Sequence, residues 1–219
     1  MELTSIDILK IMKTAIGGTM PGTNLFNAFV KNFSESDAAL LAALLKDNLH
    51  KETIRYEEIH IDPGQKKDLM LLAFEERILI PVKSRSGPAW EDKILDFGKK
   101  GCFLIPPVVK AVLDTIAEVG EPACDMAVRQ TLADVIPEDM DGFIQVLQTI
   151  MKHADNYMFE TGLLEIFFRE VSMDCDLHDF IDVCVIFGIM SPCPRKSLIT
   201  GLSWYEINPT LYWDEIFLS

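Results

Sequence analysis

Hydrophobic and polar residues recur with helical spacing along most of the chain. The clearest case begins at Ser34, which can cap a first turn, and its apolar stripe holds Leu40, Leu41, Leu44 and Leu45. The same spacing predicts further helices over residues 24–33, 65–76, 107–118, 121–135, 141–153, 160–171 and 177–187, with shorter ones near the N-terminus and over residues 51–59. Most of the chain is therefore expected to be helical.

Short β-prone segments stand between some of these helices. They cover residues 77–83, 94–97 and 101–105 in the first half and residues 189–193 and 202–207 in the second. Pro192, Pro194 and Gly201 lie in or beside the turn that would join the last two strands. Each half is thus predicted to follow its helices with strands joined by a loop.

The pattern of residues 67–82 returns at residues 178–193. A shift of 111 positions aligns Asp68 with Asp179, Leu69 with Phe180, Leu72 with Val183, Ile78 with Ile189 and Pro81 with Pro192. A second similarity relates residues 103–107 to residues 205–209, now with a shift of 102. The shift changes between the two similarities, where a surface loop tolerates insertion. The sequence therefore predicts an internal duplication.

In each half the predicted order is helix, helix, helix, strand, loop, strand, and an apolar third helix runs into a strand with a proline at its end. Over residues 34–107 and 141–213 this order resembles the winged-helix fold of the helix-turn-helix superfamily. The resemblance implies a mostly α (α+β) chain with two winged-helix domains related by internal duplication and joined by helices. The expected parts are an N-terminal helical extension (1–33), the first domain (34–107), connecting helices (108–140) and the second domain (141–219).

Charge is distributed unevenly between the two halves. The net charge of −14 arises entirely after residue 110, because residues 1–110 hold 15 Lys+Arg and 15 Asp+Glu, whereas residues 111–219 hold 5 and 19. Binding to a phosphate backbone depends on Lys and Arg, so the acidic second domain is not expected to contact nucleic acid. The asymmetry indicates that the two halves face different partners.

The remaining composition indicates a folded cytoplasmic protein. A hydrophobic fraction of 49% and a mean hydropathy of +0.18 are sufficient for a core. No apolar run reaches the roughly 18 residues of a membrane span, and the N-terminus lacks the pattern of a signal peptide, so no membrane partner is expected. The five cysteines are an odd number and are expected to be reduced thiols.

Six cations of the first domain are the candidates for nucleic-acid contact. They are Lys66 and Lys67 at the start of the third helix, and Lys83, Arg85, Lys99 and Lys100 in the wing. The alternative is an ordinary solvated loop, because Glu91, Asp92 and Asp96 are interleaved and this half has no net positive charge. Any binding to DNA is therefore expected to be weak.

The second domain offers apolar candidates for a protein interface. Its third helix is apolar on nearly every side and aromatic residues gather at its wing and tail, and the candidates are Phe180, Phe187, Trp204, Tyr205, Tyr212 and Trp213. Burial in the core is the alternative reading of these residues, and it is the favoured one both for the helix and for the aromatic cluster. An interface there would serve a protein partner or a two-fold homodimer.

Catalytic and metal-binding motifs are weak. None of the four histidines adjoins a nucleophile turn, and no Gly-rich phosphate loop is followed by a lysine. Cys175 and His178 have a spacing that zinc accepts, but a structural zinc site usually shows a pair of ligands at each end. We therefore expect no cofactor, no metal and no enzymatic activity. The favoured function is a non-enzymatic protein-interaction or assembly module, and the first alternative is a transcriptional-regulator-like protein that binds DNA through the first domain. A third, more distant alternative is a small-molecule sensor or enzyme with a site between the domains.

Overall fold

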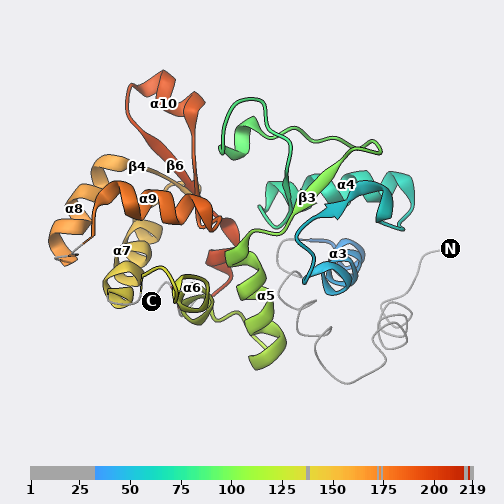
Figure 1. The fold of residues 1–219 in the computed structure, drawn as a ribbon, viewed down its shortest axis with the longest axis horizontal. Coiled ribbons are helices and arrows are strands. Elements are labelled where there is room, and N and C mark those ends of the chain that lie inside the picture. Colours follow the sequence, from blue (N-terminus) through green and yellow to red (C-terminus); the bar gives the residue numbers. More distant parts are fainter. Residues whose placement is uncertain (1–32, 137–138, 172, 174, 215–216, 218–219) are drawn as a thin grey trace.

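The structure is a computed structural model that describes residues 33–136, 139–171, 173, 175–214 and 217 (Figure 1). The helices expected near the N-terminus and over residues 24–33 therefore fall outside the described residues, except for residue 33. The described residues form a mixed α+β structure in which helices predominate and the strands are short. None of the described helices has the length and apolar character needed to cross a membrane.

The elements follow one another in an order that the two halves largely share. The first half contains α3 (Glu35–Asn48), β1 (Ile54–Arg55), the 3-10 helix η1 (Tyr56–Glu58), α4 (Pro63–Glu75), β2 (Ile80–Pro81), the 3-10 helix η2 (Trp90–Asp92) and β3 (Cys102–Leu104). The centre of the chain contains α5 (Pro107–Val119) and α6 (Cys124–Leu132). The second half contains α7 (Met140–His153), β4 (Met158–Glu160), α8 (Thr161–Val171), α9 (Leu177–Ile186), β5 (Met190–Pro192), α10 (Pro194–Thr200), β6 (Trp204–Ile207) and the 3-10 helix η3 (Pro209–Trp213).

Local caps explain why several helices begin where they do. The Ser34 hydroxyl accepts the Asp37 N–H at the start of α3. The Asp62 carboxylate accepts the Gly64 and Gln65 N–H groups at the start of α4, whose first residue is a proline that needs no donor. The helix start predicted at Ser34 is confirmed, and the helix predicted over residues 65–76 begins two residues earlier, at Pro63.

The two halves build three-stranded antiparallel sheets of the same form. The order is β1-β3-β2 in the first sheet and β4-β6-β5 in the second, so the last strand of each half is the central one. Pro81 pairs with Phe103 in the first sheet, and Pro192 pairs with Tyr205 in the second. On the other side of the central strand, Ile54 pairs with Phe103 and Phe159 pairs with Tyr205. Both sheets therefore place an aromatic residue of the central strand between the two outer strands.

The turn that follows the third helix has the same hydrogen bonds in both halves. After α4, Arg77 has a φ of 55° and the Ile78 N–H donates to the Ala73 carbonyl over 2.9 Å. After α9, Gly188 has a φ of 72° and the Ile189 N–H donates to the Cys184 carbonyl over 2.8 Å. This left-handed residue with a six-to-one hydrogen bond is the usual way to end a helix and start a strand.

Four sequence predictions differ from the structure. Residues 51–59 were expected to be a helix, but they contain β1 and η1, because Ile54 pairs with Phe103 and is buried. Residues 94–97 were expected to be a strand but run as a loop into a turn in which the Asp96 carboxylate accepts the Gly98 N–H. The helix expected over residues 121–135 is limited to α6. The turn expected between the last two strands contains α10, which begins at a proline and ends before Gly201, whose φ is 74°.

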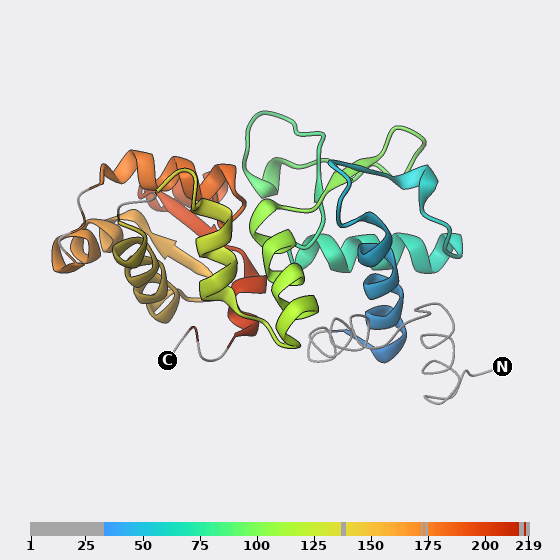
Figure 2. The same ribbon diagram turned by 60° about the horizontal axis from the view of Figure 1, so that its bottom comes forward.

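One hydrophobic core extends through both halves and the helices between them. It includes Leu45 from α3, Val112 from α5, Val128 from α6 and Leu147 from α7, all of which are buried. Helices α5 and α6 occupy the centre of the molecule, between the two sheets (Figure 2). The connecting helices are therefore part of the packed structure.

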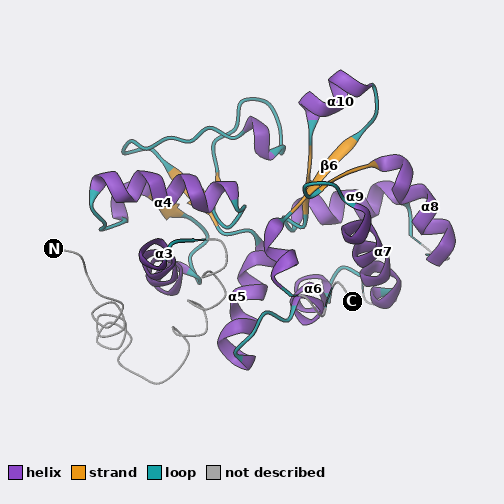
Figure 3. Ribbon diagram, turned by 180° about the vertical axis from the view of Figure 1, so that it is seen from behind, coloured by secondary structure: helices purple, strands orange, loops and turns teal. Residues whose placement is uncertain are grey.

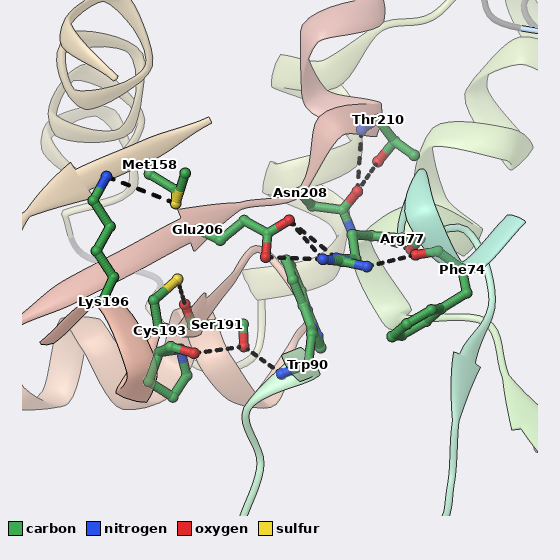
Figure 4. A network of polar contacts seen from close by, with 11 residues as sticks. Phe74, Arg77, Trp90, Met158, Ser191, Cys193, Lys196, Glu206, Asn208 and Thr210 are labelled. Carbon is green, nitrogen blue, oxygen red and sulfur yellow. Dashed lines mark hydrogen bonds and ion pairs between the residues drawn. The ribbon is translucent and has the colours of Figure 1, made fainter. Parts of the chain in front are cut away.

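Polar contacts join the two halves at a junction formed by Arg77, Trp90, Ser191, Glu206 and Asn208 (Figure 4). The Arg77 guanidinium donates to both carboxylate oxygens of Glu206 over 3.1 Å, and their side chains are only 16% and 19% exposed. The Asn208 side-chain amide donates to the Arg77 carbonyl, and the Trp90 N–H donates to the Ser191 hydroxyl over 2.8 Å. The junction therefore links the first half directly to β5 and β6.

Backbone contacts bring the end of α9 against the start of α5. The Val108 N–H donates to the Phe187 carbonyl over 3.1 Å. A Cβ added at Gly188 would lie 2.5 Å from the Pro106 Cβ, which is too close for any side chain. Gly188 is therefore required both by its positive φ and by its distance from Pro106.

We expect Gly188→Ala to lower the free energy of unfolding by about 2–4 kcal/mol, from the left-handed conformation and the steric clash together. Gly201→Ala is the matched control, because Gly201 has a similar φ of 74° and no atom within 4 Å of an added Cβ. This control should cost only about 1 kcal/mol. Urea denaturation followed by circular dichroism measures the free energy of unfolding of both variants. Equal losses of this free energy would show that the contact with Pro106 contributes nothing.

Removal of Arg77 should also destabilise the protein. Arg77→Ala leaves the Glu206 carboxylate largely buried without its partner, which we expect to cost about 2–3 kcal/mol after discounting for the remaining exposure. Arg85→Ala, at an exposed arginine of the same half, should change stability by less than about 0.5 kcal/mol. The same denaturation experiment compares them, and a loss below about 0.5 kcal/mol for Arg77→Ala would contradict a structural role of the ion pair.

Candidate interaction surface

The six cations proposed for nucleic-acid contact fall into separate places. Lys66 is buried and its ammonium lies 4.0 Å from the centre of the Tyr56 ring, so it is not exposed as the sequence led us to expect. The Lys67 ammonium lies 5.7 Å from the Phe97 ring. The other four are exposed: Lys83 and Arg85 beside the bridge between Ser84 and Lys93, and Lys99 and Lys100 in the turn that precedes β3.

The third helix of the second half does not present its large aromatic residue to a partner. Phe180 is fully buried, with its ring 4.5 Å from Phe143 and 5.1 Å from Phe168. The prediction that Phe180 lies in an interface is therefore wrong. Phe180 is a core residue, as the burial alternative expected. The exposed positions of α9 include Asp179 and Asp182, whose negative charges would repel phosphates.

The other aromatic candidates are partly buried and mostly support the fold. Phe187, Tyr205, Tyr212 and Trp213 pack against the core. The Tyr212 hydroxyl donates to the Met151 carbonyl over 3.2 Å, and its ring meets that of Tyr157 edge-on at 4.9 Å. Tyr212 therefore holds the tail against α7 and the residue that precedes β4. A homodimer through these aromatic residues stays a prediction.

The surface that sequence reasoning missed lies on α10 and the residue pair that follows it. Leu198 is 86% exposed, Ile199 is 84% exposed and Leu202 is 46% exposed. We call these three residues the apolar tip. α10 stands at the end of the β5–β6 hairpin that is farther from α5 (Figure 3). The signal that could have revealed this helix is Pro194 at its first position together with Gly201 just beyond its end.

The backbone beneath the apolar tip is held by several hydrogen bonds. The Ser197 hydroxyl donates to the Cys193 carbonyl and accepts the Trp204 N–H, so it ties α10 to β6. The indole N–H of Trp204 donates to the Thr200 hydroxyl over 2.9 Å. The Gly201 N–H donates to the Ser197 carbonyl and closes the helix. The exposed side chains therefore project from an ordered segment.

The segment also carries positive charge in an acidic half. Residues 194–203 contain Arg195 and Lys196 and no acidic residue. The Lys196 ammonium lies 3.6 Å from the Trp204 ring, whereas the Arg195 side chain is exposed. The Arg195 backbone N–H donates to the Glu91 carboxylate of the first half over 2.6 Å.

Large apolar side chains exposed elsewhere in the described residues stand on separate elements. They are Val82, Val119, Val135, Tyr157, Ile166 and Ile186. Single exposed apolar residues are normal on a protein surface, but several within five consecutive positions indicate a binding surface. The apolar tip is therefore the candidate interaction surface of this structure.

The thiols and carboxylates do not form a metal site in the described part of the chain. No three His, Cys, Asp or Glu side chains there are placed to hold a metal ion. The Cys175 thiol contacts the Asp176 carbonyl, and its pKa is raised by burial and by the neighbouring Asp179. Burial also raises the pKa of Cys193 to about 12, and it raises the pKa of Cys124 and of Cys184.

These differences predict how the thiols react. In the folded protein at pH 8, Ellman's reagent should modify the partly exposed Cys102 and, more slowly, Cys175. Cys124, Cys184 and Cys193 should react only after denaturation, because they are buried and their raised pKa values leave little thiolate. The absorbance that Ellman's reagent produces, measured at increasing urea concentration, gives the number of thiols that have reacted. Cys102→Ser should remove the faster phase, and rapid reaction of all five would contradict the burial of the other three.

Comparison with known proteins gives a match that covers both halves. The model of an uncharacterised protein family matches residues 24–214. No curated protein and no solved structure matches the chain. The matched range includes the junction and the apolar tip. The chain therefore belongs to this family.

Proposed function

We propose that this protein is a non-enzymatic protein-interaction or assembly module built from two winged-helix domains related by internal duplication. Three features of the fold support the duplication: the shared strand order of the two sheets, the equivalent pairing of Pro81 and Pro192, and the same turn at Arg77 and Gly188. One departure from the winged-helix pattern is that η1 stands where the second helix of the first domain was expected.

The observation that carries the proposed function is the apolar tip. In a winged helix the loop between the last two strands forms the wing, and here that loop contains α10 with Leu198 and Ile199 almost fully exposed. Keeping such side chains in water is unfavourable by about 1.5–3 kcal/mol each relative to burial. A partner that covers them regains this free energy, so the wing of the second domain is suited to bind protein.

Nucleic acid is a weaker fit to the described surface. In the second half, Asp179 and Asp182 are exposed on the third helix, the element that would meet DNA. In the first half, Lys67, Lys83, Arg85, Lys99 and Lys100 remain accessible, and their exposure supports the alternative of a transcriptional-regulator-like protein that binds DNA through the first domain.

We propose that the protein acts in the cytoplasm, where five unpaired thiols stay reduced.

Affinity purification from the native cell tests the proposed function. Leu198→Asp with Ile199→Asp places two charges in the apolar tip, and the recovery of specific partners should fall at least tenfold compared with the unaltered chain. Val119→Asp with Ile166→Asp is the matched control, because both residues are exposed, apolar and outside the tip. Both variants should keep the circular dichroism spectrum and the unfolding midpoint, since exposed substitutions cost little.

Nuclease treatment separates the two functions. Protein partners that resist nuclease and depend on the apolar tip would support an interaction module. Co-purifying DNA that is unaffected by the tip variant, and is lost when Lys67, Lys83, Arg85, Lys99 and Lys100 are replaced by Gln, would support the alternative instead.

A further inference from the structure

We infer that the partner binds the apolar tip in an apolar groove whose rim carries at least one carboxylate, paired with Arg195. This inference rests on the proposed function and specifies the chemistry of its partner.

The shape of the apolar tip fits a groove better than a flat surface. Leu198 and Ile199 are consecutive residues of α10, so their side chains point about 100° apart around the helix axis. Gly201 then turns the chain, with a φ of 74°, and brings in Leu202. The three exposed side chains therefore lie within five residues of a projecting segment, which a concave apolar site can cover from several sides.

The segment is ordered before any partner binds. The Ser197 hydroxyl and the Trp204 indole fix both ends of α10 through hydrogen bonds of 2.8–2.9 Å. Binding therefore loses little backbone entropy, and the exposed side chains need only to settle into their rotamers. A projection of this kind can act as an anchor even though its area is small.

The charge of the segment specifies the rim of the groove. Residues 194–203 have two cations and no acidic residue, in a half of the chain that has 5 Lys+Arg and 19 Asp+Glu. The Lys196 ammonium already lies over the Trp204 ring, which leaves the exposed Arg195 side chain as the cation available to a partner. A guanidinium forms its strongest contacts with a carboxylate, through two parallel hydrogen bonds.

Two other occupants fit less well. A second copy of the chain would bring two strongly acidic halves together, and the other exposed apolar side chains of the described residues stand on separate elements. An anionic lipid surface would repel the same acidic half, against which Arg195 and Lys196 supply only two cations.

The experiment begins with the full chain carrying a photo-reactive benzophenone side chain at position 199. Crosslinking in the native cell, followed by mass spectrometry, identifies the protein and the peptides that face the tip. That protein is then purified and titrated by calorimetry with four forms of the chain: unaltered, Leu198→Asp, Arg195→Glu and the control Val119→Asp. We expect Leu198→Asp to abolish binding, Arg195→Glu to weaken it at least tenfold and Val119→Asp to leave it unchanged.

Charge exchange supplies the decisive measurement. A change of an Asp or Glu to Lys within the crosslinked peptides should restore at least part of the binding that Arg195→Glu loses, which a general effect on folding would not do. If Leu198→Asp abolishes binding while Arg195→Glu has no effect, the carboxylate rim is wrong and the interaction module stands. If neither variant changes binding, both proposals fail.

The remaining outcomes also overturn the inference. They are the absence of any crosslinked protein, partition of the chain onto vesicles of phosphatidylserine and phosphatidylcholine that Leu198→Asp prevents, and a dimer in light scattering that Leu198→Asp dissociates. The first result would leave the apolar tip without a protein partner. The second would assign it to a membrane surface, and the third to a second copy of the chain.

Discussion

The arrangement of the two halves depends on the ion pair between Arg77 and Glu206. Arg77 follows α4 in a left-handed conformation, while Glu206 lies on the central strand of the second sheet. The guanidinium also donates to the Phe74 carbonyl and lies over the Phe74 and Trp90 rings, so its position is fixed from several directions. Two parallel hydrogen bonds offset the loss of hydration that both charges suffer in this little-exposed place. Together with the shared core, this contact therefore fixes the orientation of β6 and of the hairpin that carries α10.

Sequence reasoning succeeded where structure is determined by neighbouring residues. Ser34 caps α3 through a hydroxyl that accepts an N–H three residues ahead, and the apolar stripe of α7 follows directly from its spacing. Strand β1 was not predicted, because two residues form a strand only by pairing with a distant partner. For Ile54 that partner is Phe103. The helix α10 was hidden within a segment whose proline and glycine also fit a turn. What makes it a helix is a set of backbone hydrogen bonds, such as those from the Ser197 N–H to the Cys193 carbonyl and from the Gly201 N–H to the Ser197 carbonyl.

The candidate surface was less predictable than the fold, for a physical reason. Phe180 and Leu198 both belong to apolar helical segments of the second half, yet one is fully buried and the other is 86% exposed. The hydrophobic pattern indicates which side chains are more stable when buried. It does not indicate whether the rest of the chain covers them. α9 is covered by α7 and α8, whereas α10 lies beyond the sheet and is held by Trp204 and by the Glu91 carboxylate, so Leu198 and Ile199 stay exposed. The basic residues show the same limit, because Lys66 is drawn onto the Tyr56 ring by contacts that its neighbours in sequence do not reveal.

The hydrogen bond from the Arg195 backbone to Glu91 has a consequence for communication through the molecule. It connects the segment that bears the exposed leucines to the loop between β2 and β3, and the same loop contributes Trp90 to the junction. A ligand that prefers the conformation in which this bond is formed must stabilise the contact between the halves. By thermodynamic linkage, closer association of the halves must then raise the affinity for that ligand by the same factor.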